Sequence, residues 1–220
     1  MTAVALLGVI SGPVLAVEVT GNAGVVSEYV FRGVPSSDGK AAAQGGLDAA
    51  WDSGFYLGTW GSSVDFDGAD GVEMDFYGGY GGEIGDFSYG IGATLYTYTD
   101  DADEDYQEIN LSGGWKWFTV DYAKGEYDAM GGPDVDYDFW SITAEYEGFY
   151  ATFGSLGDDL FMGVDSDYYE AGYGGTVTVA DQDLFDFSIS WIASDKGLLI
   201  GSTSENRLVF GVTKSFDILN

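Results

Sequence analysis

The sequence has no cysteine and no histidine, and it sets only seven basic residues against 37 acidic ones. The absence of cysteine excludes disulfides and thiolate metal sites. The absence of histidine excludes Ser-His and Cys-His catalysis, histidine zinc sites and pH switching by imidazole. A formal net charge of −30 repels DNA and RNA, so nucleic acid is not expected as a partner.

Long apolar runs are also absent after the N-terminal stretch. No later segment approaches the ~18 apolar residues that a membrane helix needs. The first stretch, M-T-A-V-A-L-L-G-V-I-S-G-P-V-L-A, has the apolar core and small final residues of a secretory signal. We therefore expect residues 1–16 to be a signal peptide and residues 17–220 to form a single domain. The alternative for residues 1–16 is a buried N-terminal strand.

What the chain does have is 35 glycines, 16% aromatic residues and apolar side chains that recur at every second position. In Val72–Tyr80, Val72, Met74 and Phe76 share one face, and Glu73 and Asp75 share the other. Residues 88–98 alternate in the same way. Such strands place one face against an apolar environment and the other against a polar one.

Short and long connections alternate between these strands. Short ones fall at 52–54, 82–86, 112–114, 147–148 and 180–183, and longer acidic, glycine-rich ones begin at Gly33, Asp65, Thr99, Gly125, Gly157 and Ser194. This segregation is typical of an all-β, antiparallel, up-and-down transmembrane β-barrel. A soluble acidic β-sandwich is the alternative.

We predict about twelve strands, with ten to fourteen compatible with the pattern. Their length of about ten residues suits a tilted strand that crosses a bilayer. The predicted strands are 24–32, 42–51, 54–62, 72–81, 87–98, 105–113, 115–124, 136–146, 149–156, 167–179, 184–193 and 205–216. Aromatic residues near the strand ends, including Tyr29, Trp60, Tyr98, Tyr137 and Phe139 beside the long loops, predict girdles at the membrane interfaces.

The stretch V-S-E-Y-V-F-R-G at residues 26–33 places an acid and an arginine in the first predicted strand. Alternation assigns Val26, Glu28, Val30 and Arg32 to one face, and Ser27, Tyr29 and Phe31 to the other. We assign the charged face to the lumen and the other face to lipid. Glu28 and Arg32 would stand roughly 13 Å apart along a strand, so each needs another partner.

Several motifs resemble a proteobacterial family of outer-membrane porins known as TorF-like or Gcw_chp. The motifs are S-E-Y-V-F-R-G at 27–33, A-A-A-Q-G-G-L-D at 41–48, G-F-Y-L-G-T-W at 54–60, E-M-D-F-Y-G-G-Y at 73–80 and G-V-T-K-S-F at 211–216. The resemblance implies a barrel in the bacterial outer membrane with a channel role. It supplies no catalytic residues.

If the apolar faces meet lipid, the polar faces line the lumen. The residues assigned to it are Glu28, Arg32, Gln44, Asp48, Glu73, Asp75, Glu108, Asn110, Asp121 and Arg207. Their excess of carboxylates predicts passive passage of small, cationic or neutral solutes. The alternative is a non-conducting structural or surface-interaction barrel, whose acidic loops make cation-bridged contacts with lipopolysaccharide. The expected partners are membrane lipid, lipopolysaccharide and small solutes, and association of identical barrels stays open.

The acidic loops carry a second hypothesis, weak calcium binding. D-F-D-G-A-D-G-V-E at 65–73 departs from the EF-hand order, because Ala69 occupies a ligand position. The candidate ligands are Asp65, Asp67, Asp70, Asp100, Asp101 and Asp103, and the alternative is a set of solvated, mutually repelling loops. We expect no other cofactor. Two neighbouring carboxylates could act as a catalytic acid and base, but among 37 acidic residues some lie together by chance, so we expect no enzymatic activity.

Overall fold

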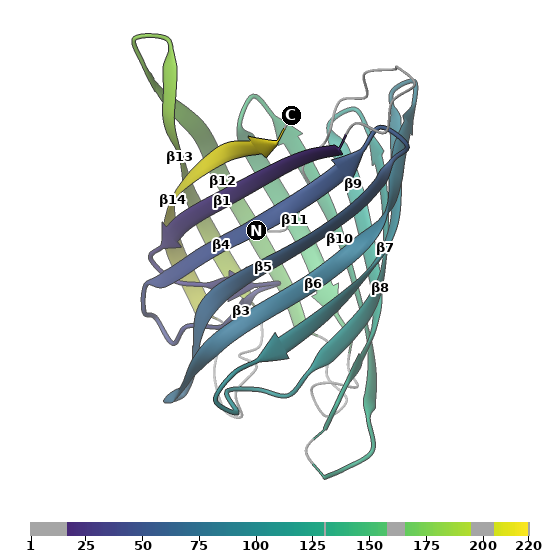
Figure 1. The fold of residues 1–220 in the computed structure, drawn as a ribbon. Helices are drawn as coiled ribbons and strands as arrows, with labels where there is room; N and C mark the ends of the chain where they lie inside the picture. Colours follow the sequence, from purple (N-terminus) through teal and green to yellow (C-terminus); the bar gives the residue numbers. More distant parts are fainter. Residues whose placement is uncertain (1–16, 130, 158–165, 195–204, 220) are drawn as a thin grey trace.

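The computed structural model describes residues 17–129, 131–157, 166–194 and 205–219, and its strands close into one antiparallel barrel (Figure 1). Each wall strand pairs with the next wall strand along the chain, and the first and last wall strands pair with each other and so close the ring. The wall consists of β1 (Val17–Val26), β4 (Ala42–Trp51), β5 (Phe55–Phe66), β6 (Ala69–Ile84), β7 (Phe87–Tyr98), β8 (Tyr106–Trp115), β9 (Phe118–Tyr127), β10 (Val135–Tyr146), β11 (Phe149–Leu156), β12 (Ser166–Val179), β13 (Gln182–Ser194) and β14 (Glu205–Leu219). The predicted twelve-stranded up-and-down barrel is confirmed.

The wall turns its apolar side chains outward. Along β7 the exposed positions are Phe87, Tyr89, Ile91, Ala93 and Leu95, and the intervening side chains point inward. Among the described residues, buried positions include Glu73, Asp75 and Glu108. A water-soluble protein shows the opposite distribution, so the outer face suits lipid. None of the described residues belongs to a helix long and apolar enough to cross a membrane.

Most predicted strands lie where the structure has them, and β4, β7 and β11 begin and end at the predicted residues. The prediction of the first strand is wrong. It runs from Val17 to Val26 instead of 24–32, because the chain leaves the wall after Val26. The predicted signal peptide, residues 1–16, lies outside the described residues.

Two predicted connections are also wrong. The residues 65–71 contain no long loop: Asp67 and Gly68, with φ of 55° and 95°, form a two-residue hairpin between β5 and β6. The predicted turn at 112–114 lies inside β8, and the chain turns at Lys116 and Trp117 instead. Gly114 lies within the wall close to β7, and a Cβ there would approach Ser88 Oγ to 2.3 Å unless the serine side chain rotated away.

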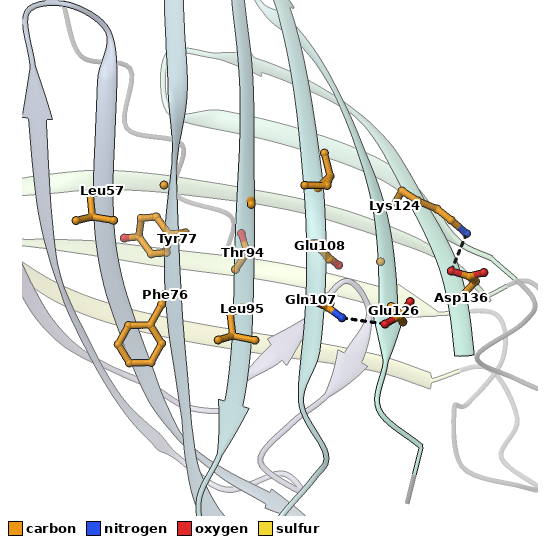
Figure 2. Close-up of a pocket in the computed structure, with 14 residues that line it drawn as sticks. Leu57, Phe76, Tyr77, Thr94, Leu95, Gln107, Glu108, Lys124, Glu126 and Asp136 are labelled. Carbon is orange, nitrogen blue, oxygen red and sulfur yellow. Dashed lines mark hydrogen bonds and ion pairs between the residues drawn. The ribbon is translucent and has the colours of Figure 1, made fainter. Parts of the chain in front are cut away.

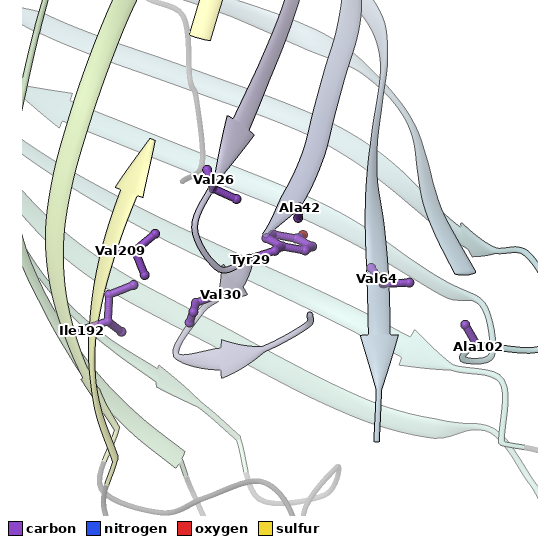
Figure 3. Packing of buried hydrophobic residues seen from close by; sticks show 8 residues of the cluster. All are labelled: Val26, Tyr29, Val30, Ala42, Val64, Ala102, Ile192 and Val209. Atoms are coloured by element: carbon purple, nitrogen blue, oxygen red, sulfur yellow. The ribbon is translucent and has the colours of Figure 1, made fainter. Parts of the chain in front are cut away.

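Residues 27–41, here called the inward segment, connect β1 to β4 and fold into the barrel at its long-loop end. The segment carries the short strands β2 (Val30–Phe31) and β3 (Val34–Pro35), which pair with each other inside the ring of wall strands (Figure 1). Figure 3 shows Tyr29 and Val30 between Val64 of β5 on one side and Ile192 and Val209 of β13 and β14 on the other.

The segment is therefore surrounded by the wall. Arg32 and Gly33 have φ of 51° and 82°, which ends any extended strand at this point. Tyr29 is buried, and Phe31 packs against the buried cluster, so neither faces lipid as predicted. Trp60, Tyr98, Tyr137 and Phe139, predicted for an interfacial girdle, also pack inside the barrel, in two clusters around the segment.

Candidate functional site in the barrel interior

The interior differs between its two ends. Near the short turns, inward side chains such as Ser88 and Ser112 remain partly exposed. Near the long loops, inward side chains are buried around the inward segment. A solute pathway through the barrel would therefore be wide at the short-turn end and narrow at the segment.

Arg32 is the central charge of the inward segment. Its Nη1 and Nη2 donate to Oε1 and Oε2 of Glu108 on β8 at 2.5 and 3.0 Å, and the two side chains are only 8% and 1% exposed. The guanidinium carbon lies 4.0 Å from the ring centroid of Phe139 and 4.6 Å from that of Phe31. Arg32 thus points into the interior, but from the inward segment and not from a wall strand.

Glu108 accepts further hydrogen bonds. Tyr96, Tyr137 and Asn110 donate to it at 3.1, 2.8 and 2.8 Å, and Asn110 in turn accepts from Thr94 at 2.9 Å. Both oxygens of this buried carboxylate are consequently satisfied, as an ionised group away from water requires.

Two more ion pairs hold the segment at its ends. Arg207 of β14 pairs with Glu28 where the segment begins. Lys40 pairs with Asp65 of β5 where the segment ends. The backbone adds a bond from Asp65 N to Ser36 O at 3.0 Å. The segment is therefore tied to the wall at both ends and at its middle.

Among the residues that the structure describes, Glu73 and Asp75 on β6 form no ion pair with an arginine or a lysine. Tyr29 Oη donates to Glu73 Oε1 at 2.7 Å. Asp75 is 8% exposed, and its Oδ1 has no hydrogen-bond partner among the described residues. Asp75 therefore differs from Glu28, Asp65 and Glu108, each of which meets an arginine or a lysine.

The remaining predicted lumen residues lie inward and are partly exposed. Gln44 donates to Ser62 Oγ at 3.3 Å, and Asp48 accepts from Tyr77 Oη at 2.5 Å. Asp121 lies opposite Ser112 in the partly exposed half. The structure thus places all ten predicted side chains on the inner side, although only some of them are close together.

Sequence reasoning missed Glu170, which faces inward from β12 and accepts from Tyr150 Oη at 2.5 Å. Alternation in S-D-Y-Y-E-A, with Tyr169 exposed and Tyr168 buried, would have found it. It also missed the tyrosines as the main donors to interior carboxylates. No local pattern marks these, because donors and acceptors come from strands far apart in the chain.

The six candidate calcium ligands are not gathered at one place. Asp65 pairs with Lys40, and Asp67, Asp70, Asp100 and Asp101 are exposed. Asp103 accepts from Tyr106 at 2.9 Å and Tyr127 at 3.4 Å, and burial raises the pKa of its carboxyl. Among the described residues, the carboxylates grouped within 4.8 Å are instead Glu126, Asp128 and Asp134.

A hollow of about 710 Å³ lies along the wall over β5–β10 (Figure 2). Much of its lining is the outward-facing set of Leu57, Phe76, Leu95 and Ile109, joined by Gln107, Lys124, Glu126 and Asp136. Gln107 donates to Glu126 at 2.9 Å, and Lys124 pairs with Asp136 at 3.8 Å. Because these side chains point away from the lumen, this hollow is not the solute pathway.

Fold and interior together define the class: a transmembrane β-barrel with an apolar outer face and a charged interior that a chain segment enters. The chain belongs to the family described as "Bacterial protein of unknown function (Gcw_chp)", whose model matches residues 11–216. The predicted membership of Gcw_chp is confirmed. A comparison with curated proteins found no match.

One solved structure shares the fold at low identity, and two others are similar with lower scores. A structure described as "Unveiling the Mechanism Behind the in-meso Crystallization of Membrane Proteins" gives a TM-score of 0.52 at 11% identity, over 90% of this chain and 84% of that one. Pseudomonas aeruginosa OpdK with vanillate gives 0.47 at 12% identity, over 90% of this chain and 66% of that one. P. aeruginosa OccK2 (OpdF) gives a TM-score of 0.43 at 11% identity, over 92% of this chain and 81% of that one. The chain spans about two thirds of the length of OpdK.

Proposed function

We propose that the protein is a porin-like channel of the bacterial outer membrane. It lets small solutes pass passively, as the resemblance to TorF-like porins implies, and the excess of carboxylates in its interior favours cations. The inward segment forms the constriction of this channel. The protein has no catalytic role.

The distribution of charge across the wall carries this proposal. The inward carboxylates among the described residues include Glu28, Asp48, Asp65, Glu73, Asp75, Glu108, Asp121 and Glu170, and the basic residues paired with them are Arg32, Lys40 and Arg207. A narrow pathway with this excess of negative charge attracts cations and repels anions. The apolar outer face supports a location in lipid, where membrane lipid and lipopolysaccharide surround the barrel.

Planar-bilayer conductance across a potassium chloride gradient tests the proposal. We expect discrete channels whose reversal potential indicates cation preference. A reversal potential on the anion side would contradict the selectivity. Silence at all voltages would contradict the channel itself. The detergent-extracted barrel is identified beforehand by heat-modifiable migration on gels.

The second candidate is a non-conducting structural or surface-interaction barrel. The buried clusters around the inward segment favour it, because they fill the long-loop half of the interior. In this case the acidic loops act through weakly bound calcium that bridges them to lipopolysaccharide or to a second barrel. Calorimetry with calcium on the folded protein tests this function, and the absence of heat at millimolar calcium would contradict it.

A further inference from the structure

Among the buried carboxylates, the described basic residues pair with Asp65 and Glu108 but leave Glu73 and Asp75 without a counter-charge. Glu28 pairs with Arg207, Asp65 with Lys40 and Glu108 with Arg32. Glu73 accepts from Tyr29. Asp75 is nine-tenths buried, and its Oδ1 accepts no hydrogen bond from any described residue. A buried carboxylate in this state must bind a positive charge or become neutral.

The neighbours of Asp75 are aromatic. Cross-strand pairing places Trp60 of β5 on one side of it and Tyr96 of β7 on the other. The inward segment covers both rings: Tyr29 packs edge-on against Trp60 at 5.5 Å between centroids, and Phe31 against Tyr96 at 5.9 Å. Aromatic rings attract cations such as ammonium groups to their faces, and the carboxylate of Asp75 adds a negative charge beside them.

A second carboxylate strengthens the negative potential at this point. Glu73 lies two residues before Asp75 on the same face of β6, roughly 6.6 Å away by the rise of a strand. Its hydrogen bond from Tyr29 carries no positive charge to offset Asp75. The charge of Arg32 is already matched by Glu108. When ionised, the pair on β6 therefore carries negative charge beside the inward segment that no ion pair among the described residues offsets.

We propose that Asp75, with Glu73 beside it and Trp60 and Tyr96 around it, is the binding site for one monovalent cationic group in the constriction. The group is a potassium-sized ion or the ammonium of a small organic solute. The site rests on the proposed channel function for its role in selectivity, but cation binding itself requires no conduction.

The first test measures selectivity. Asp75→Asn keeps the shape of the side chain and removes its charge, so the reversal potential in a potassium chloride gradient should move towards zero. Asp136→Asn, the same change on the outer face, should leave it at the wild-type value. A wild-type reversal potential in Asp75→Asn would overturn the site while leaving the channel in place.

The second test needs no conduction. The midpoint of heat modifiability in detergent is measured with potassium, methylammonium or N-methylglucamine chloride at one ionic strength. Potassium or methylammonium should raise the midpoint of the wild type relative to N-methylglucamine, and Asp75→Asn should lose this shift. The cation that gives the larger shift identifies the group that the site prefers. Equal midpoints in all three salts would overturn the proposal, even if the channel conducts.

A third measurement covers the case in which Asp75→Asn does not assemble. Crystals of the wild-type protein grown in rubidium chloride should show anomalous scattering beside Asp75 Oδ1. No such peak would again overturn the site. A silent bilayer together with a rubidium peak would contradict the channel and retain the site, so the two failures are distinguishable.

Discussion

Arg32 and Glu108 lie 76 residues apart in the chain, and two contacts of 2.5 and 3.0 Å join them inside the barrel. Arg32 comes from the inward segment and Glu108 from β8, so the pair fixes the middle of the segment to the wall. A segment with only two two-residue strands has few backbone bonds of its own to hold it. Its position therefore depends largely on side-chain contacts with the wall.

Arg32→Gln removes one member of a buried ion pair and leaves Glu108 uncompensated. We expect the free energy of unfolding to fall by ~3–5 kcal/mol. Urea unfolding in lipid vesicles measures it. The control is Lys116→Gln, because Lys116 and Asp86 form an exposed pair at 3.7 Å, whose loss should cost at most ~1 kcal/mol. Equal losses in the two variants would show that Arg32 does not anchor the segment.

The same variant should change conduction. With its central anchor removed, the inward segment spends more time away from the constriction, so single-channel conductance should rise above that of the wild type. Planar-bilayer recordings of Arg32→Gln and Lys116→Gln at one salt concentration make the comparison. A conductance unchanged by Arg32→Gln would mean that the segment does not limit the pathway.

Gly33 and Gly39 provide a matched pair on the inward segment. Both have positive φ, 82° and 70°, so alanine is strained at either position. A Cβ on Gly33 would also approach Tyr168 Cβ to 2.5 Å, whereas nothing lies within 4 Å of one on Gly39. We expect Gly33→Ala to destabilise the barrel by ~1–3 kcal/mol more than Gly39→Ala. Urea unfolding of the two variants measures the difference in the free energy of unfolding. Equal losses would contradict the close contact between Gly33 and Tyr168 of β12.

The sequence predicted the wall strands and their inward faces well but missed the inward segment, for a physical reason. Alternation at period two reports which face of a strand meets lipid, and it assigned Glu73, Asp75 and Glu108 to the inner side. It failed at Tyr29 and Phe31, because the inward segment is as aromatic as a lipid-facing strand. Both environments favour aromatic side chains, so composition alone does not distinguish them. In the sequence, nothing but the following glycine, Gly33, indicated that the backbone turns at Arg32 with a positive φ.

Ile91 tests the assignment of the outer face. It is 52% exposed near the middle of β7 and lies opposite Leu111 of β8, which is also exposed. Ile91→Arg should cost ~2–4 kcal/mol of folding free energy in a bilayer, because it places a charge in hydrocarbon. Ser112→Arg, on the inner face opposite Asp121, is the control and should be tolerated. Folding yields in vesicles compare the two, and a tolerated Ile91→Arg would contradict the outer assignment.

Asp103 in the loop between β7 and β8 predicts a pH dependence. Burial raises the pKa of its carboxyl above the ordinary value of about 3.9, so the folded state binds the proton more tightly than the unfolded state. Its contribution to stability is therefore present below that ordinary value and is lost as pH rises through the raised pKa. Asp103→Asn keeps an acceptor for Tyr106 and should flatten the unfolding free energy measured across this pH range. Asp100→Asn, at an exposed residue of the same loop, is the control and should retain the wild-type slope. If Asp103→Asn also retained that slope, the buried carboxyl would not be its source.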